Sequence, residues 1–252
     1  MHIVMAPKSF TKALAATLLT VGLTTSTAFA DTTAASSALP VAQLVAEPLP
    51  AWQLEQIDTT IGITYLSEQE RAVILEINRL RSDPAKYARH YLLPLRAYYQ
   101  GDLLTYPGDI SLVTEEGVAA LEECILALER AQPAPMLSPR KGLVLAARDH
   151  AADQSRTGET GHTGSDASSM TTRTNRYGKW ITSVGENISY GDAEARKIVT
   201  ALLIDDGVPS RGHRANLLQS GFAVVGVAIA THPVYRQMCV MDFAGDYATK
   251  AG

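Results

Sequence analysis

The chain has 252 residues, of which 46% are hydrophobic and 19% are charged, and its formal net charge is −4. This length and apolar content suit one domain with a substantial core. The acidic balance and the lack of a basic block exclude the electrostatic footprint of a protein that binds nucleic acid or an anionic membrane surface. We therefore expect no nucleic-acid partner.

The first residues of the chain have the three parts of a secretory signal peptide. Lys8 and Lys12 form a positive segment, ALAATLLTVGL (13–23) is apolar, and AFA (28–30) is an A-x-A cleavage pattern. The apolar run is shorter than the about 20 residues that span a bilayer. We predict cleavage after residue 30, a secreted or periplasmic protein that begins at Asp31, and no transmembrane segment.

The next segment, residues 31–66, is rich in Ala, Thr, Ser and Pro, which is typical of a flexible or loosely docked leader. The folded domain is predicted over residues 67–252. It begins with a helix, because Ser67 and Glu70 form a capping box before apolar residues at helical spacing. The dipeptide Asp-Pro at 83–84 ends this helix and can start another.

Helices and strands both follow in the second half of the chain. The predicted elements are helices over about 115–130 and from about 138 to 157, a strand over 180–188, a helix over 192–204, and strands over 222–230 and 235–244. The strand 222–230 is apolar throughout, as expected of a strand covered on both faces. Helices that flank a small sheet predict a mixed, layered α/β fold.

Two cysteines follow the predicted signal peptide, in a compartment that permits disulfides. Cys124 lies on the apolar stripe of a predicted helix, and Cys239 lies in an apolar strand. Both patterns are typical of buried thiols. A disulfide between Cys124 and Cys239 is the alternative that the sequence leaves open.

Three residues are candidates for a site. His162 and His213 lie in glycine-bracketed segments, where backbone can approach a ligand closely. Glu186 lies on an otherwise apolar strand, where a buried carboxylate needs a partner. For the other histidines of the predicted mature chain, a structural role is the simpler interpretation; they are His90, His150 and His232.

Two acids at the end of the helix 192–204 raise a separate question. Asp205 and Asp206 fall at the negative end of the helix dipole, where cations are favoured. One hypothesis is that Arg211 or Arg214 neutralises them. The other is that one of the two acids faces a histidine of the site.

Four motifs in the expected order resemble the CAP superfamily, which comprises cysteine-rich secretory, antigen 5 and pathogenesis-related proteins. GENISYG (185–191) resembles its G-E-N-I signature, and GHRANLL (212–218) resembles the secreted bacterial branch. EINRLRSDPAKYA (76–88) resembles its first helix, and GHTGSDASS (161–169) resembles the loop with its first histidine. The resemblance covers about residues 67–247.

This resemblance implies an α-β-α sandwich with a central cleft. It maps the two cavity histidines of the family to His162 and His213, which in relatives can hold a divalent metal such as zinc, and the G-E-N glutamate to Glu186. Animal relatives have a second glutamate on the helix before the last histidine, where this chain has Asp205 and Asp206. We favour Asp206 for the cleft.

Two more positions in these motifs lead to structural predictions. Ala167 stands where the family usually has glycine, which would restrict the loop after the first histidine. Asn187 begins a match to the glycosylation sequon, but we predict that it anchors the loop through hydrogen bonds instead.

The function that we predict from the sequence is a secreted binding or interaction module with a metal-capable cleft and no turnover, because no residue set resembles an activated nucleophile. The alternative is a metal-dependent hydrolase. In it, His162, His213 and a carboxylate would leave an open coordination position for water, with Glu186 or an aspartate as the base. A sterol or other lipid ligand is less favoured, because the animal loop linked to sterol binding has no recognisable counterpart.

Overall fold

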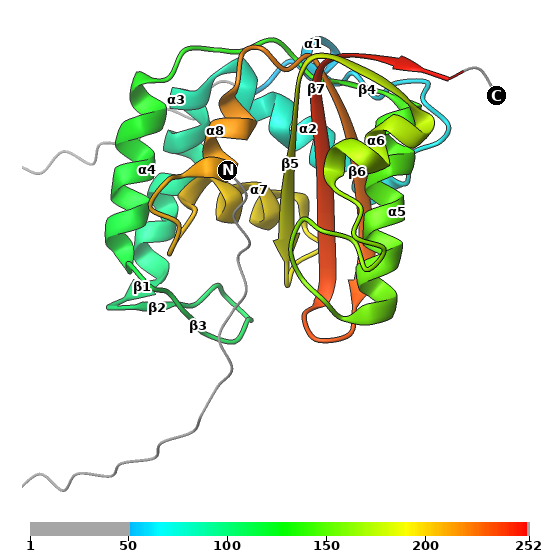
Figure 1. The fold of residues 1–252 in the computed structure, drawn as a ribbon. Coiled ribbons are helices and arrows are strands. Elements are labelled where there is room, and N and C mark those ends of the chain that lie inside the picture. Colours follow the sequence, from blue (N-terminus) through cyan, green and yellow to red (C-terminus); the bar gives the residue numbers. More distant parts are fainter. Residues whose placement is uncertain (1–50, 251–252) are drawn as a thin grey trace, which may run out of the picture. The chain divides into compact units, whose positions relative to one another are not determined.

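The computed structural model describes residues 51–250. The predicted signal peptide and most of the predicted leader lie outside these residues. The fold is drawn in Figure 1. Among residues 51–250, no helix combines the length and the apolar content needed to cross a bilayer.

The first part of the domain is helical. Its elements are α1 (Leu54–Ile57), α2 (Glu68–Ser82), α3 (Pro84–Tyr87), a π-helical segment (Ala88–Leu92), a 3-10 segment (Leu93–Tyr98) and, after three two-residue strands, α4 (Val118–Arg130). The predicted capping box is confirmed, because Ser67 Oγ accepts a hydrogen bond from the Glu70 N–H and the Glu70 carboxylate accepts one from the Ser67 N–H. Asp83 likewise caps α3, with Pro84 in its first turn.

The central sheet has four strands in the order β4-β6-β7-β5. They are β4 (Ser138–Pro139), β6 (Val224–His232), β7 (Arg236–Thr249) and β5 (Gly178–Tyr190). The strands β6, β7 and β5 pair antiparallel, and the short β4 runs parallel to β6. Within residues 51–250, β5 is therefore an edge strand, with no strand partner on one side of its backbone. A second, small sheet joins β1 (Tyr99–Gln100), β2 (Leu103–Leu104) and β3 (Leu112–Val113), which the sequence did not predict.

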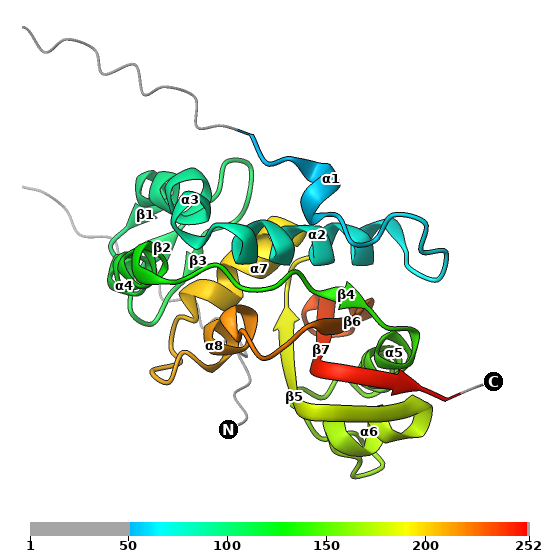
Figure 2. The ribbon, with the colours of Figure 1, turned by 90° about the horizontal axis from the view of Figure 1, so that it is seen from above.

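Helices cover both faces of the central sheet. α5 (Lys141–Thr157) and α6 (Met170–Tyr177) pack on one face, and α2, α7 (Ala195–Ile204) and α8 (Gly212–Leu218) pack on the other. Figure 2, seen from above, shows the sheet between these two helical layers. The predicted α-β-α sandwich is confirmed. The sequence did not predict α6, which lies between the glycine-rich loop and β5.

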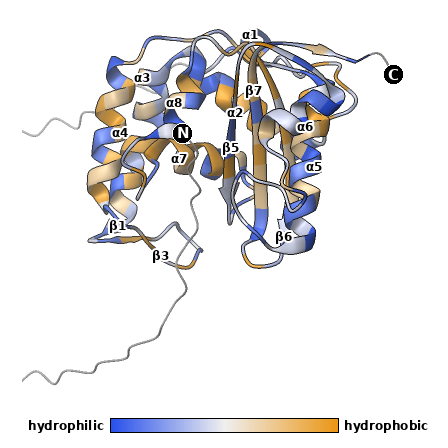
Figure 3. Ribbon diagram, in the orientation of Figure 1, coloured by the Kyte–Doolittle hydropathy of each residue, from blue (hydrophilic) through white to orange (hydrophobic). Residues whose placement is uncertain are grey.

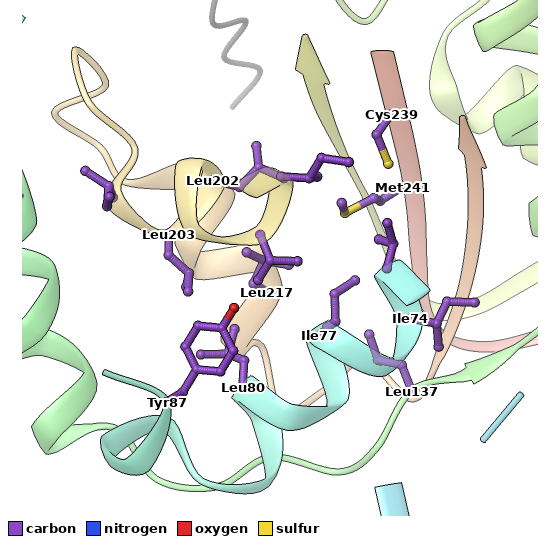
Figure 4. Close-up of a cluster of buried hydrophobic side chains, with 14 of the residues drawn as sticks. Ile74, Ile77, Leu80, Tyr87, Leu137, Leu202, Leu203, Leu217, Cys239 and Met241 are labelled. Atoms are coloured by element: carbon purple, nitrogen blue, oxygen red, sulfur yellow. The ribbon is translucent and has the colours of Figure 1, made fainter. Parts of the chain in front are cut away.

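The core follows the alternation of side chains along the strands. Met241 and Phe243 of β7 pack in the large apolar cluster with α2 and α7, whereas Val240 packs with α5. Figure 4 shows Leu202 of α7 and Ile77 of α2 in the same apolar interior as Met241. In Figure 3, β7 and α7 are coloured mostly hydrophobic, and α4 and α5 alternate between hydrophobic and hydrophilic turns.

Glycine allows α5 to lie directly on the sheet. A Cβ atom at Gly226 of β6 would lie 2.1 Å from the carbonyl carbon of Leu143 and 2.3 Å from the amide nitrogen of Val144, both on α5. Real carbon atoms do not approach this closely without a shift of the backbone. The spacing between α5 and β6 therefore depends on the missing side chain.

The folded domain begins before residue 67. Trp52 donates a hydrogen bond to Ser82 Oγ at 3.0 Å, and Asn78 of α2 donates to the Ile57 carbonyl at 2.9 Å. Thr59 donates to the carbonyl that precedes β4 at 2.6 Å. Ordered structure therefore extends before the predicted boundary at residue 66, because aromatic and polar side chains of this segment anchor it to α2 and to the chain before β4.

The two cysteines are free thiols, and both are buried. Cys124 donates to the Leu203 carbonyl at 3.3 Å, and Cys239 lies in β7 among apolar side chains. Burial raises the pKa of Cys124 to about 12 and also raises the pKa of Cys239. Cys124 and Cys239 therefore do not form the disulfide that the sequence left open.

Candidate functional site

His213 forms a buried pair with Asp205. Asp205 ends α7 in the left-handed conformation, with φ 55°, and His213 lies in the first turn of α8 rather than in a loop. One carboxylate oxygen accepts a hydrogen bond from His213 Nδ1 at 2.6 Å, and the other accepts from the His213 backbone N–H at 3.0 Å. Asp205 is 0% exposed and His213 is 2% exposed. Both ring orientation and backbone position are fixed by one carboxylate.

Asp206, which we favoured for the site, lies elsewhere. Its carboxylate accepts hydrogen bonds from the backbone N–H groups of Glu115 and Glu116 at 2.7 and 2.8 Å, just before α4. The left-handed turn at Asp205 sends the two neighbouring side chains in different directions, and the phase of a helix end is not fixed by sequence. The acid that contacts His213 is therefore Asp205.

The two arginines that could have neutralised the helix end have other partners. Arg211 pairs with Glu116 at 2.6 Å, and Arg214 pairs with Glu123 at 2.7 Å. Their only hydrogen bonds to the end of α7 go to backbone carbonyls, including Arg211 to the Asp205 carbonyl at 2.7 Å. The hypothesis that an arginine neutralises Asp205 or Asp206 is not supported by these contacts.

His162 forms the second pair, with Glu186 of β5. His162 Nδ1 donates to Glu186 Oε1 at 2.7 Å, and Arg173 of α6 donates to Glu186 Oε2 at 2.7 Å. Burial by itself raises the pKa of Glu186. The hydrogen bond from His162 and the charge of Arg173 act in the opposite direction, and together they hold the pKa below its ordinary value. Glu186 is thus a carboxylate whose two oxygens are both engaged.

The loop that carries His162 is fixed from α5 and β5. The Gly161 carbonyl accepts hydrogen bonds from His150 Nε2 at 2.7 Å and from Gln154 at 2.6 Å, and the Gly161 N–H donates to the Tyr190 hydroxyl at 3.0 Å. Gly161 has a φ of 108°, which favours glycine. His150 therefore has the structural role that the sequence predicted.

Asn187 ties β5 to α8. Its amide donates to the His213 carbonyl at 3.0 Å, and its carbonyl oxygen accepts from Asn216 of α8 at 2.8 Å. The prediction that Asn187 anchors this region by hydrogen bonds is confirmed. Because side chains alternate along a strand, Asn187 faces α8, whereas Glu186 faces α6.

Arg81 holds the far end of α8. This arginine is 0% exposed, and its hydrogen-bond partners in the described part of the chain are carbonyl groups: Leu217 at 2.8 Å, Gln219 at 3.0 Å, Phe222 at 2.8 Å and Pro135 at 2.7 Å. Burial lowers the pKa of its guanidinium to about 10. Arg81 thereby ties the helix that carries His213 to α2.

Both histidine–carboxylate pairs connect to the edge strand β5, the first through Glu186 and the second through the hydrogen bond from Asn187 to the His213 carbonyl. In each pair the carboxylate contacts Nδ1, so Nε2 is the ring nitrogen directed to other contacts. Nε2 of His213 is buried and has no hydrogen-bond partner among residues 51–250. Over the same residues, no group of three or more His, Cys, Asp or Glu side chains is arranged to hold a metal ion.

Two open hollows lie elsewhere, around the start of α7. The first, of about 270 Å³, is lined by Tyr91, Tyr98 and Tyr106 among others. The second, of about 430 Å³, lies between α2 and α7, where Arg196 and Glu76 form an ion pair at 2.9 Å. None of the predicted site residues lines either hollow.

A sheet between two helical layers, with two histidine–carboxylate pairs at its edge strand, agrees with the resemblance noted in the sequence. The model of the cysteine-rich secretory protein family, CAP, matches residues 75–243, and the chain belongs to this family.

Two solved structures are similar to the chain. One is an extracellular protein containing an SCP domain from Bacillus anthracis str. Ames, with 23% identity over 44% of this chain and a TM-score of 0.36. The chain covers 34% of that protein. The other is an outer surface protein from Borrelia burgdorferi, with 18% identity, a TM-score of 0.37, and coverage of 43% of this chain and 76% of that one. A comparison with curated proteins gave no match.

Two further residues at the site were not predicted from the sequence. Arg173 lies on the helix that was missed, although a buried Glu186 implied some positive partner. Asp242 lies in β7, directly opposite Glu186 in the strand pairing. The signal for Asp242 was available, because it is a single acid within an apolar strand, the same pattern that singled out Glu186.

Proposed function

We propose that this protein is a secreted binding module that holds its ligand at the two histidine–carboxylate pairs without turning it over. The observation that carries this proposal is Nε2 of His213, a buried ring nitrogen without a hydrogen-bond partner in the described part of the chain. Buried polar atoms are usually paired, so an unpaired one calls for an explanation such as a ligand. Asp205 aims this atom by holding the opposite ring nitrogen.

A divalent metal such as zinc is the ligand that we propose to test first. The Nε2 atoms of His162 and His213 would hold it, with Glu186 and Asp205 behind them in the manner of carboxylates that orient metal-bound histidines. A bound zinc ion would offer Lewis acidity or a coordination position for a partner's donor. Two imidazoles are fewer than the three protein ligands of catalytic zinc sites, which favours binding over catalysis.

The test is calorimetric titration of zinc into the purified domain at pH 7.5. Wild type should bind one ion, and His162→Ala and His213→Ala should each weaken binding at least tenfold. His232→Ala is the matched control, since both ring nitrogens of His232 have hydrogen-bond partners, and it should bind as wild type does. Equal binding by wild type and both site variants would rule out the metal proposal.

Hydrolysis finds less support than binding. Both oxygens of Glu186 accept from His162 and Arg173, and both oxygens of Asp205 accept from His213, so each carboxylate already orients protein groups, which is a different role from that of a base for water. A library of peptides and esters, incubated with and without zinc, tests this directly. Turnover that disappears in His213→Ala would contradict a binding-only function.

We also propose that the protein is exported and cleaved before Asp31. The support is the order of positive, apolar and A-x-A segments in residues 1–30, together with membership of a family of secretory proteins. N-terminal sequencing of the stable protein from cells should give Asp31. A stable protein that retains Met1 or Met5 would contradict the proposal.

A further inference from the structure

Asp242 is a buried acid without a donor. It is 0% exposed, and no amide, hydroxyl, guanidinium or imidazole group among residues 51–250 donates to either of its oxygens. In the sheet it lies opposite Glu186 of β5 on one side and opposite Gly226 of β6 on the other. Directly opposite residues have Cβ atoms about 4.5–5.5 Å apart, so the carboxyl groups of Asp242 and Glu186 are near neighbours.

Two adjacent buried carboxylates cannot both be ionised at a tolerable cost. Glu186 receives hydrogen bonds from His162 and Arg173, which favour its charged form. Asp242 receives none, so the charge belongs on Glu186 and a proton belongs on Asp242.

The groups around Asp242 agree with this distribution. Burial raises the pKa of Asp242 well above its usual value, the charge of Glu186 raises it further, and Arg173 of α6 opposes both. On β6 its neighbour is Gly226, which carries no charge, and on its own strand the nearby titratable group is Tyr247, whose pKa is raised by burial and by the Asp242 carboxyl group. No cation contacts Asp242 directly among the described residues.

We propose that Asp242 is a neutral carboxylic acid that donates its proton in a hydrogen bond to Glu186, and so holds the Glu186 carboxylate against His162. A carboxylate oxygen has two lone pairs, so Glu186 can accept this bond in addition to those from His162 and Arg173. Asp242 is then a positioning residue, two contacts away from any ligand. Its importance for binding rests on the proposed function, but its protonation can be measured without a ligand.

The first test observes the proton itself. In protein with ¹³C-labelled aspartate carboxyl groups, one resonance should keep the chemical shift of a protonated acid from pH 5 to pH 8. That resonance should be missing from Asp242→Asn. A wild-type spectrum in which every aspartate is ionised at pH 7 would overturn the proposal.

The second test uses the pH dependence of stability. The folded protein keeps a proton on Asp242 that the unfolded chain releases above about pH 3.9, so rising pH favours unfolding. The ratio of the unfolding constants of wild type and Asp242→Asn should therefore increase about tenfold per pH unit between pH 5 and 7. Asp246→Asn, at an exposed position of the same strand, is the control and should give a flat ratio. A flat ratio for Asp242→Asn would also refute the inference.

The third test separates positioning from mere space filling. The hydrogen-bonded Nδ1 proton of His162 should be visible by proton NMR in wild type and in Asp242→Asn, whose amide can still donate to Glu186. It should shift or exchange away in Asp242→Val, which has no donor. An unchanged signal in Asp242→Val would assign Asp242 a packing role only. If Asp242→Val does not fold, the wild-type and Asp242→Asn measurements still decide the protonation. Absence of zinc binding by wild type would refute the proposed metal ligand and leave these three results intact.

Discussion

The replacement of Asp205 by Asn probes how one carboxylate controls the chemistry of His213. In the wild type the carboxylate accepts from Nδ1–H, so a neutral ring has its lone pair on Nε2. In Asp205→Asn the amide oxygen can accept from the His213 backbone N–H, which leaves the amide N–H₂ facing the ring. Two donors cannot share that contact, and the ring proton should move to Nε2.

The expected effect on stability is moderate. A hydrogen bond to a charged group contributes about 1.5–3 kcal/mol and a neutral one about 0.5–1.5 kcal/mol. Two bonds change from the first kind to the second, at 2.6 and 3.0 Å in the wild type. The free energy of unfolding should therefore fall by about 2 kcal/mol, and the domain should remain folded.

The expected effect on binding is larger, because Nε2–H cannot ligate a metal. Zinc affinity should fall about 10–100-fold, as is usual when a residue that orients a ligand is changed. Nitrogen-15 NMR of the imidazoles reports the tautomer, and calorimetry reports the affinity. The neighbouring Asp206→Asn is the matched control, and it should change neither quantity. An Nδ1–H tautomer that persists in Asp205→Asn would refute the reasoning, whatever the zinc result.

Three further predictions concern packing and backbone. Ala167 has a φ of 60°, a left-handed conformation that strains alanine by about 1–2 kcal/mol. Ala167→Gly removes this strain but increases the conformational entropy of the unfolded chain, so it should stabilise the domain by about 0.5–1 kcal/mol in denaturant unfolding. Gly226→Ala should cost about 3 kcal/mol or more by the same assay, because α5 must move away from β6, whereas Gly221→Ala has room and serves as the control. Cys124 and Cys239 should resist thiol reagents at pH 8 until the protein unfolds, and rapid labelling under native conditions would contradict their burial.

Local patterns in the sequence determined much of the fold. The capping box of α2, the Asp-Pro start of α3 and the apolar strands β6 and β7 all depend on neighbouring residues, so sequence spacing predicts them. The order of four motifs also indicated the family, which the match over residues 75–243 confirms. Anchoring by Asn187 was likewise predicted, from its place in the G-E-N motif.

Long-range contacts decided the rest. The sequence could not choose between Asp205 and Asp206, because a single left-handed residue at the end of α7 sets which acid faces His213 and which one meets the chain before α4. It also could not place Arg173 on Glu186, since that contact requires α6 to fold over the edge strand. The protonation expected of Asp242 arises only when β5 and β7 pair in register and bring two acids together in the interior. A sequence thus specifies which residues can carry charge, whereas the tertiary structure decides which charges meet a partner and which must be neutralised.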